Sequence, residues 1–172
     1  MDMMNQGELR ALYNAVPQTQ DNANLLQMIE GLMRSKNVIK KPFTYSTNFA
    51  AANLTAGATV TNQLAIQSDA PFLVQAQAYT ADVAAAGQTA SSSTYPLVNV
   101  LMTNTGSGMQ LMNQAVPVTQ IFGNGQFPFV LPEPLLLDAR TNLQIAATNR
   151  DAAQAYNLFL SFIGVKLFAF NG

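Results

Sequence analysis

Apolar and polar residues alternate along several short segments of the chain after residue 58. Val60, Leu64 and Ile66 share one side of the first such segment, and polar residues fill the other side. The same period of two recurs in the segments 72–78, 98–103, 143–148 and 156–163. This pattern predicts antiparallel strands with one face against a core and the other face towards solvent.

Turn-forming residues separate these segments at 53–57, 68–71, 105–108 and 123–125, and a longer small and polar loop is expected over 81–93. Because no helical pattern lies between the predicted strands, the predicted fold class is mainly β, an antiparallel β-sandwich or barrel. The prolines of 127–134 cannot donate to a ladder, which predicts an edge or crossing strand there. Strands are expected after the glycines of 106–108 and 123–125, so hairpin turns are favoured over phosphate-binding loops.

The first 41 residues have a helical period instead. Their apolar stripe consists chiefly of Leu9, Leu12, Leu25, Ile29, Leu32 and Met33. This spacing predicts two short helices joined by a turn that contains Pro17. A piece of this size cannot bury a core alone, so its stripe is expected to dock either on the chain's own sandwich or on another subunit. These six residues are the candidate assembly interface.

Charge divides the chain at nearly the same place. Residues 1–41 hold five basic and four acidic side chains, whereas no Lys or Arg occurs from 42 through 139. The shift predicts a helical N-terminal arm over 1–41 and a β-sandwich domain over 42–172. The basic cluster 34–41 is interpreted as a solvated helix end and exit linker, and it lacks the aromatic residues that stack on bases.

Composition removes most catalytic chemistry from consideration. The 172 residues include no His, Cys or Trp, and the formal net charge is −1. The chain therefore has no imidazole base, no thiolate and no disulfide, and its charge gives no footprint for nucleic acid. Glu133 and Asp138 form the closest carboxylate pair of the β region, but a spacing of five places them on opposite faces of a strand. No catalytic residue, cofactor or metal site is expected.

The remaining charged residues bear on the protein surface, and the apolar stretches bear on its location. Asp138, Arg140, Arg150 and Asp151 are expected in inter-strand turns that carry weak surface salt bridges. The most apolar stretch, 158–170, is shorter than the roughly 20 residues that span a bilayer, and the N-terminus lacks a signal-peptide pattern. We expect a soluble chain that is made in a cytoplasm and has no membrane partner.

The low charge also bears on the oligomeric state of the protein. Charged residues make up 10% of the chain, against about 25% in typical globular domains. The β region instead offers amide and hydroxyl groups and almost no lysine that could block an edge strand. A lone sandwich of this kind is prone to edge pairing, so the composition predicts a homo-oligomer surrounded by neighbours.

The last third of the chain resembles the closing strands of jelly-roll structural proteins from tailed-bacteriophage virions. The resemblance consists of a proline-flanked apolar strand at 127–137, an L-x-I-x-x-x-N strand at 143–149, and a final strand that ends on Gly164-Val165-Lys166. It implies a jelly-roll-like sandwich that serves as a capsid decoration (cement) or other minor virion component. It also implies synthesis in the host cytoplasm and contacts with other virion proteins, such as a major capsid protein.

A binding module is the main alternative, for example a carbohydrate- or receptor-binding sandwich of a phage tail or fibre. Such a module would expose aromatic residues on one face. Phe43, Tyr45, Phe49 and Tyr79 are the residues that would form it.

Overall fold

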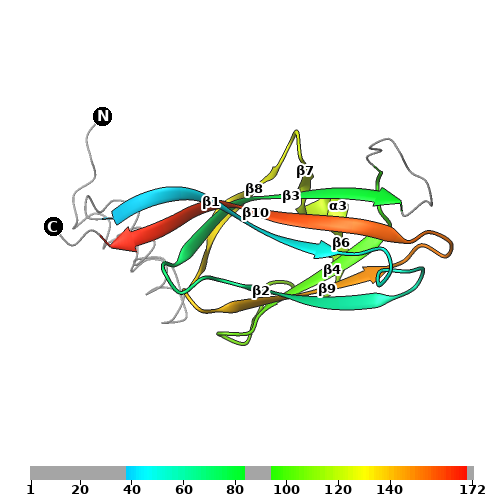
Figure 1. Ribbon diagram of the computed structural model, residues 1–172, viewed down its shortest axis with the longest axis horizontal. Coiled ribbons are helices and arrows are strands. Elements are labelled where there is room, and N and C mark those ends of the chain that lie inside the picture. Colours follow the sequence, from blue (N-terminus) through cyan, green and yellow to red (C-terminus); the bar gives the residue numbers. More distant parts are fainter. Residues whose placement is uncertain (1–37, 84–93, 170–172) are drawn as a thin grey trace, which may run out of the picture. The chain divides into compact units, whose positions relative to one another are not determined.

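The computed structural model describes residues 38–83 and 94–169, and these contain ten strands and one short helix (Figure 1). The elements are β1 (Val38–Phe49), β2 (Thr59–Ala65), β3 (Phe72–Val83), β4 (Val98–Asn104), β5 (Met109–Gln110), β6 (Val116–Pro117), α3 (Val118–Ile121), β7 (Gly123–Asn124), β8 (Phe129–Leu137), β9 (Asn142–Asn149) and β10 (Tyr156–Ala169). The predicted helical arm, including Leu9, Leu12, Leu25, Ile29, Leu32 and Met33, lies outside the described residues.

The strands form two sheets. Sheet A has the order β1-β10-β3, and β7 and β8 both pair with β3 on its other side. Sheet B has the order β2-β9-β4, and β5 and β6 both pair with the free side of β4. The pairings of β3 with β8 and β10, of β9 with β2 and β4, and of β4 with β5 and β6 are antiparallel, whereas the short contact of β7 with β3 is parallel. The two sheets face each other as layers in Figure 1, so the predicted antiparallel sandwich is confirmed.

Pairing in this sandwich is nested along the chain. The first strand pairs with the last (β1 with β10), the second with the second to last (β2 with β9), and β3 with β8. The innermost strand, β4, pairs with the short β5 and β6 that follow it. Consecutive long strands β1 to β4 therefore alternate between sheets A and B.

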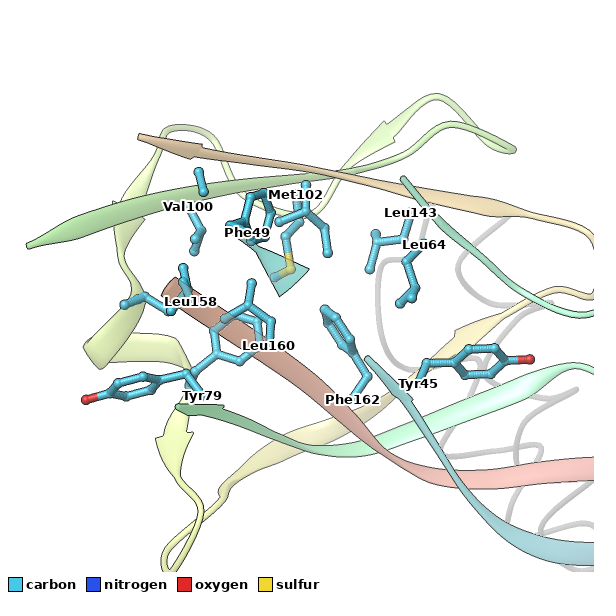
Figure 2. Packing of buried hydrophobic residues seen from close by; sticks show 14 of the residues in the cluster. Tyr45, Phe49, Leu64, Tyr79, Val100, Met102, Leu143, Leu158, Leu160 and Phe162 are labelled. Carbon is cyan, nitrogen blue, oxygen red and sulfur yellow. The ribbon is translucent and has the colours of Figure 1, made fainter. Parts of the chain in front are cut away.

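The core lies between the sheets, where the alternating apolar positions meet. Figure 2 shows Leu158, Leu160 and Phe162 of β10 directed towards side chains of sheet B such as Val100 and Leu143. The three β10 residues have no solvent-exposed area. The Phe122 ring, just after α3, packs edge-on against Phe162 with centroids 5.6 Å apart. Burial of this apolar surface is the main term that holds the two layers together.

Strand β8 confirms the interpretation of its prolines. Among the described strands it pairs with β3 alone, and the register moves from Val74↔Leu135 to Ala76↔Val130. Residues 131–134 therefore bulge out of the ladder, and this bulge contains Pro132 and Pro134. A residue without an N–H is tolerated there because no ladder bond is lost.

The structure corrects the predicted boundaries in two places. Strand β1 begins at Val38, so residues 38–41 are strand and not the helix end and linker that their charges suggested. Strand β3 runs on to Val83, so the first three residues of the expected loop belong to the sheet. The remainder of that loop, 84–93, lies outside the described residues. Side chains at alternate positions of 43–49 pack towards the core, so β1 is a strand of the sandwich although lysines precede this segment.

Candidate functional site

A buried lysine, Lys166, lies at the centre of a polar cluster. Lys166 lies on β10 and is 3% exposed, while Asp69 and Gln67 lie in the loop between β2 and β3. The Lys166 Nζ donates to both carboxylate oxygens of Asp69, at 2.8 and 2.9 Å, and to Gln67 Oε1. The same Nζ lies 4.1 Å from the centroid of the Phe43 ring and 5.7 Å from that of Tyr45. The ammonium group therefore occupies a cage of aromatic faces and oxygen acceptors.

The charges of this pair stabilise each other. Burial alone would lower the pKa of Lys166, but the hydrogen bond that its ammonium donates to Asp69, together with the charge of that carboxylate, raises it above the usual lysine value. The hydrogen bond from Lys166 lowers the pKa of Asp69 below its usual value. Lys166 is therefore cationic at neutral pH and unsuited to nucleophilic chemistry, so we assign the cluster a structural role.

A polar cleft of about 420 Å³ lies at the end of sheet B where the β4–β5 and β8–β9 turns meet. Its lining residues are Asn104, Thr105, Gly106, Ser107, Asp138, Ala139, Arg140, Thr141 and Asn142. Two of them are buried and bonded to each other: the Thr141 hydroxyl donates to Asn104 Oδ1 at 3.1 Å. The N–H of Gly106 donates to the same oxygen at 3.0 Å. A Cβ at Gly106 would lie 1.9 Å from Thr141 Oγ1, so the close approach of the two turns requires glycine.

Arg140 gives this cleft an unusual backbone. Its φ of 67° lies in the left-handed region, which costs a non-glycine residue roughly 1–2 kcal/mol. The turn is closed by the N–H of Thr141 on the carbonyl of Asp138, and the side chains of Asp138 and Arg140 are exposed at the cleft. The cleft thus offers amide, hydroxyl, carboxylate and guanidinium groups to a small polar ligand. It contains no nucleophile paired with a base.

The turn from β9 to β10 is built on Asn149, which the sequence did not single out as structural. Asn149 is 1% exposed, and its Nδ2 lies within hydrogen-bond distance of the carbonyls of Leu54, Thr55 and Gln154. Its Oδ1 accepts the N–H of Asp151 at 2.9 Å. One side chain thereby anchors the β1–β2 connection to the β9–β10 turn.

Asp151 completes this turn through hydrogen bonds. Its carboxylate accepts the Tyr156 hydroxyl at 2.6 Å and the backbone N–H groups of Ala153 and Gln154. These bonds lower the pKa of Asp151, the tyrosine bond most of all. The turn was predicted correctly, but the salt bridges were wrong. Within residues 38–83 and 94–169, no ion pair joins any two of Asp138, Arg140, Arg150 and Asp151.

An apolar groove of about 240 Å³ opens on the β8 side of the sandwich. It is lined by Gln77, Met102, Leu111, Met112, Ile121, Phe129, Leu131, Glu133 and Leu135. Large exposed apolar side chains lie in and just before β8: Phe127 is 76% exposed and Val130 is 72% exposed. An exposed apolar patch next to a groove is typical of a protein contact surface.

Charged residues are distributed unequally between the sheets. The five strands of sheet B contain no Asp, Glu, Lys or Arg. Sheet A carries Lys40, Lys41, Asp82, Glu133 and Lys166. The outer face of sheet B is built mainly from Thr, Asn and Gln, with a Thr59–Thr148 hydroxyl contact of 2.9 Å across β2 and β9. The charge deficit of the β region is therefore complete in one of the two layers.

The aromatic face expected of a binding module does not form from the residues proposed for it. Tyr45, Phe49 and Tyr79 are at most 7% exposed and belong to the core, and Phe43 is half-buried against Tyr45 and Lys166. The alternation of Phe43, Tyr45 and Phe49 in β1 indicates core positions, whereas Tyr79 is buried after the register shift of β3 between Val74 and Ala76. The more exposed rings are Tyr95, Phe127, Phe129 and Phe159.

Comparison of the chain with protein-family models, with curated proteins and with solved structures gave no match. Over the described ranges, no helix has the length and apolar character needed to cross a membrane. In the same ranges, no three acidic residues converge into a group that could hold a metal ion.

Proposed function

We propose that this protein is a structural subunit of a larger assembly, a virion component such as a capsid decoration or minor capsid protein. The observation that carries the proposal is sheet B, a complete layer of the sandwich without a single charged residue in its strands. Isolated soluble domains usually have roughly 25–35% charged residues on their surface. A layer made of hydroxyl and amide groups is suited to packing against neighbouring subunits.

The strand order supports a jelly-roll form of the sandwich. A jelly roll is a long antiparallel hairpin rolled into two sheets, so its first and last strands pair and the inner strands nest within them. The pairs β1–β10, β2–β9 and β3–β8 follow that scheme. Jelly rolls occur among viral capsid and lectin domains. The order is therefore compatible with both the assembly function and its main alternative.

The partners proposed are further copies of the chain and other virion proteins, such as a major capsid protein. The apolar stripe of the N-terminal arm, for which Leu25, Ile29 and Leu32 are the central candidates, would clamp a neighbouring subunit or the shell. No cofactor, membrane or nucleic acid is needed for this role. The location proposed is the virion, after synthesis in the host cytoplasm.

Sedimentation velocity over a wide range of protein concentration tests the assembly. We expect oligomers that persist at high salt, because uncharged contacts are not screened. Negative-stain images should show a discrete particle, and mass spectrometry should find the chain in purified virions. A monodisperse monomer at every concentration and salt condition would contradict the proposal.

The polar cleft favours the second candidate, a carbohydrate- or receptor-binding module. Planar carboxylate, amide and guanidinium groups bind hydroxyl-rich ligands through paired hydrogen bonds, and Asp138, Arg140 and Asn142 line the cleft. A glycan array tests this function directly. Signals lost in an Asp138→Ala variant of unchanged thermal stability would support it, and an array without signals would remove it.

A further inference from the structure

Strand β2 presents an open hydrogen-bonding edge. Its only ladder partner within the described residues is β9, and the half-buried Asn62 side chain donates to the Asn48 carbonyl of β1 at 2.7 Å. Just beyond its two ends, Asn149 N donates to Ala58 O and Ile66 N donates to Thr141 O, so the even-numbered residues face β9. Backbone groups alternate in direction along an antiparallel strand. The N–H and C=O groups of Thr59, Thr61, Gln63 and Ala65 therefore point away from the sheet.

The other edges of the sandwich are protected against pairing. Strand β1 carries Lys40, Lys41 and Pro42 in its first half. Strand β8 carries a bulge with Pro132, Glu133 and Pro134. The pieces β5, β6 and β7 have two residues each. Lysine, proline, bulges and short strands are the devices with which proteins prevent edge-to-edge association.

Strand β2 has none of these devices. Its seven residues, Thr59–Ala65, include no charge and no proline, and it keeps an unbroken register with β9. The side chains of Thr59, Thr61, Gln63 and Ala65 are exposed. A protein that had to remain a monomer would be expected to carry a blocking residue here.

We propose that β2 pairs antiparallel with β2 of a second copy, about a two-fold axis through Asn62. This inference rests on the proposed assembly function and assigns one interface to it. Pairing about Asn62 sets Thr61 opposite Gln63, both on the outer face, and Val60 opposite Leu64, both on the face towards the core. Each face of β2 therefore meets the same face of the partner strand. The two B sheets become one continuous sheet across the dimer.

A second copy is the occupant that best fits this edge. A two-fold interface brings residues near the axis close to their own copies, so a charge at position 61, 62 or 63 would lie near its own sign. The absence of charge from β2 removes this repulsion. The seven-residue length is matched automatically, and the half-buried Val60 gains the partner's Leu64 as an apolar neighbour.

A proline substitution tests the edge without breaking the sheet. The N–H of Thr61 points away from β9, so Thr61→Pro removes no bond of the existing ladder, as at other solvent-facing edge prolines. The matched control is Thr61→Val, which keeps the N–H and the branched Cβ. Sedimentation equilibrium should show the dimer dissociation constant raised by about tenfold or more in Thr61→Pro, because two symmetry-related positions each lose a hydrogen bond. Thr61→Val should dimerise like the original chain.

Cysteine cross-linking tests the register. The chain has no cysteine, so a single introduced thiol gives an unambiguous product. Asn62→Cys would face its own copy in a pair whose separation permits a disulfide, whereas Thr61→Cys would lie diagonally from its copy, about 7–8 Å away. Oxidation should therefore give a covalent dimer with Asn62→Cys and leave Thr61→Cys largely monomeric. Thermal unfolding under reducing conditions checks that both variants fold.

These outcomes separate the interface from the assembly function. If the original chain forms oligomers that neither Thr61→Pro nor the cysteines affect, the β2 interface is wrong and the assembly function stands. If the original chain is a monomer at every concentration, both are wrong. Co-purification of a different protein that Thr61→Pro releases would also overturn the pairing of identical copies.

Discussion

Lys166 and Asp69 lie 97 positions apart in the chain, yet the ammonium of Lys166 contacts both carboxylate oxygens of Asp69. The two partners differ sharply in exposure: the Lys166 side chain is 4% exposed and that of Asp69 is 48% exposed. The contact fastens the β2–β3 loop to β10 in sheet A. Because only the lysine is buried, the two partners should respond differently to substitution.

Asp69→Ala is expected to lower the midpoint of thermal unfolding more than Lys166→Met does. The alanine leaves a buried ammonium without its counter-ion, whereas methionine keeps the packed stem and leaves a carboxylate that water can solvate. Differential scanning calorimetry of both variants measures the two shifts. Equal shifts, or a larger one for Lys166→Met, would show that packing and not charge governs this cluster.

The same pair predicts how stability depends on pH. The pKa of Asp69 is lowered from its usual value of 3.8, so its contribution is present above that value and is lost as pH falls through the folded-state pKa. The pKa of Lys166 is raised from 10.5, so its contribution is present below that value and is lost as pH rises through the folded-state pKa. Urea unfolding of the original chain and of Asp69→Asn should differ by a constant amount near neutrality; the difference should shrink below pH 3.8 and disappear once the pH lies below the folded-state pKa of Asp69. A difference that persists there would exclude ionisation of Asp69 as its cause.

Gly164 marks the point where β10 slips by one residue against β3. A Cβ at this position would lie 2.0 Å from the carbonyl oxygen of Leu73, and backbone cannot yield as a side chain does. Gly164→Ala is therefore expected to cost about 1–3 kcal/mol of unfolding free energy, as overpacking of a core does. Gly125→Ala is the matched control, since a Cβ there meets no atom within 4 Å. Chemical denaturation of both variants measures the costs, and equal stabilities would contradict the close approach.

Local chemistry explains which strands were predictable. The prolines of 127–134 identified an edge because a missing N–H restricts a residue wherever it lies in the chain. Phe43, Tyr45 and Phe49 of β1 alternate just as clearly, but residues 38–41 were assigned to the predicted arm because of their lysines. Those aromatic residues were then considered for a binding face, although spacing by two already indicated the core.

Long-range contacts left no comparable signal. Nothing near Lys166 in sequence points to Asp69, and nothing near Asn149 points to the Leu54 carbonyl. The polar cleft likewise joins two turns whose residues are individually ordinary. The scarcity of charge in the β region was visible in the sequence, but the complete absence of charge from the strands of sheet B depends on which strands pair.

Asn149 should be among the most sensitive polar residues of the sandwich. Asn149→Ala leaves a buried set of backbone carbonyls and the N–H of Asp151 without their partner, which we expect to cost about 1–3 kcal/mol. Gln144→Ala on the outer face of the same strand is the control and should change the unfolding free energy little. If urea denaturation finds the two variants equally stable, ordered water replaces the Asn149 amide.

The apolar stripe predicted for the N-terminal arm can be tested by a substitution. Ile29 lies within the predicted apolar stripe, so Ile29→Asp places a charge where the arm is expected to dock on a neighbour. Gln27→Asp adds the same charge about half a helical turn away, on the polar side. Sedimentation velocity should show assembly abolished in Ile29→Asp and retained in Gln27→Asp. Far-ultraviolet circular dichroism should find the β signal intact in both variants, because the sandwich has its own core. Normal assembly of Ile29→Asp would show that the arm does not hold the subunits together, whereas loss of the β signal would show that the arm docks on its own sandwich.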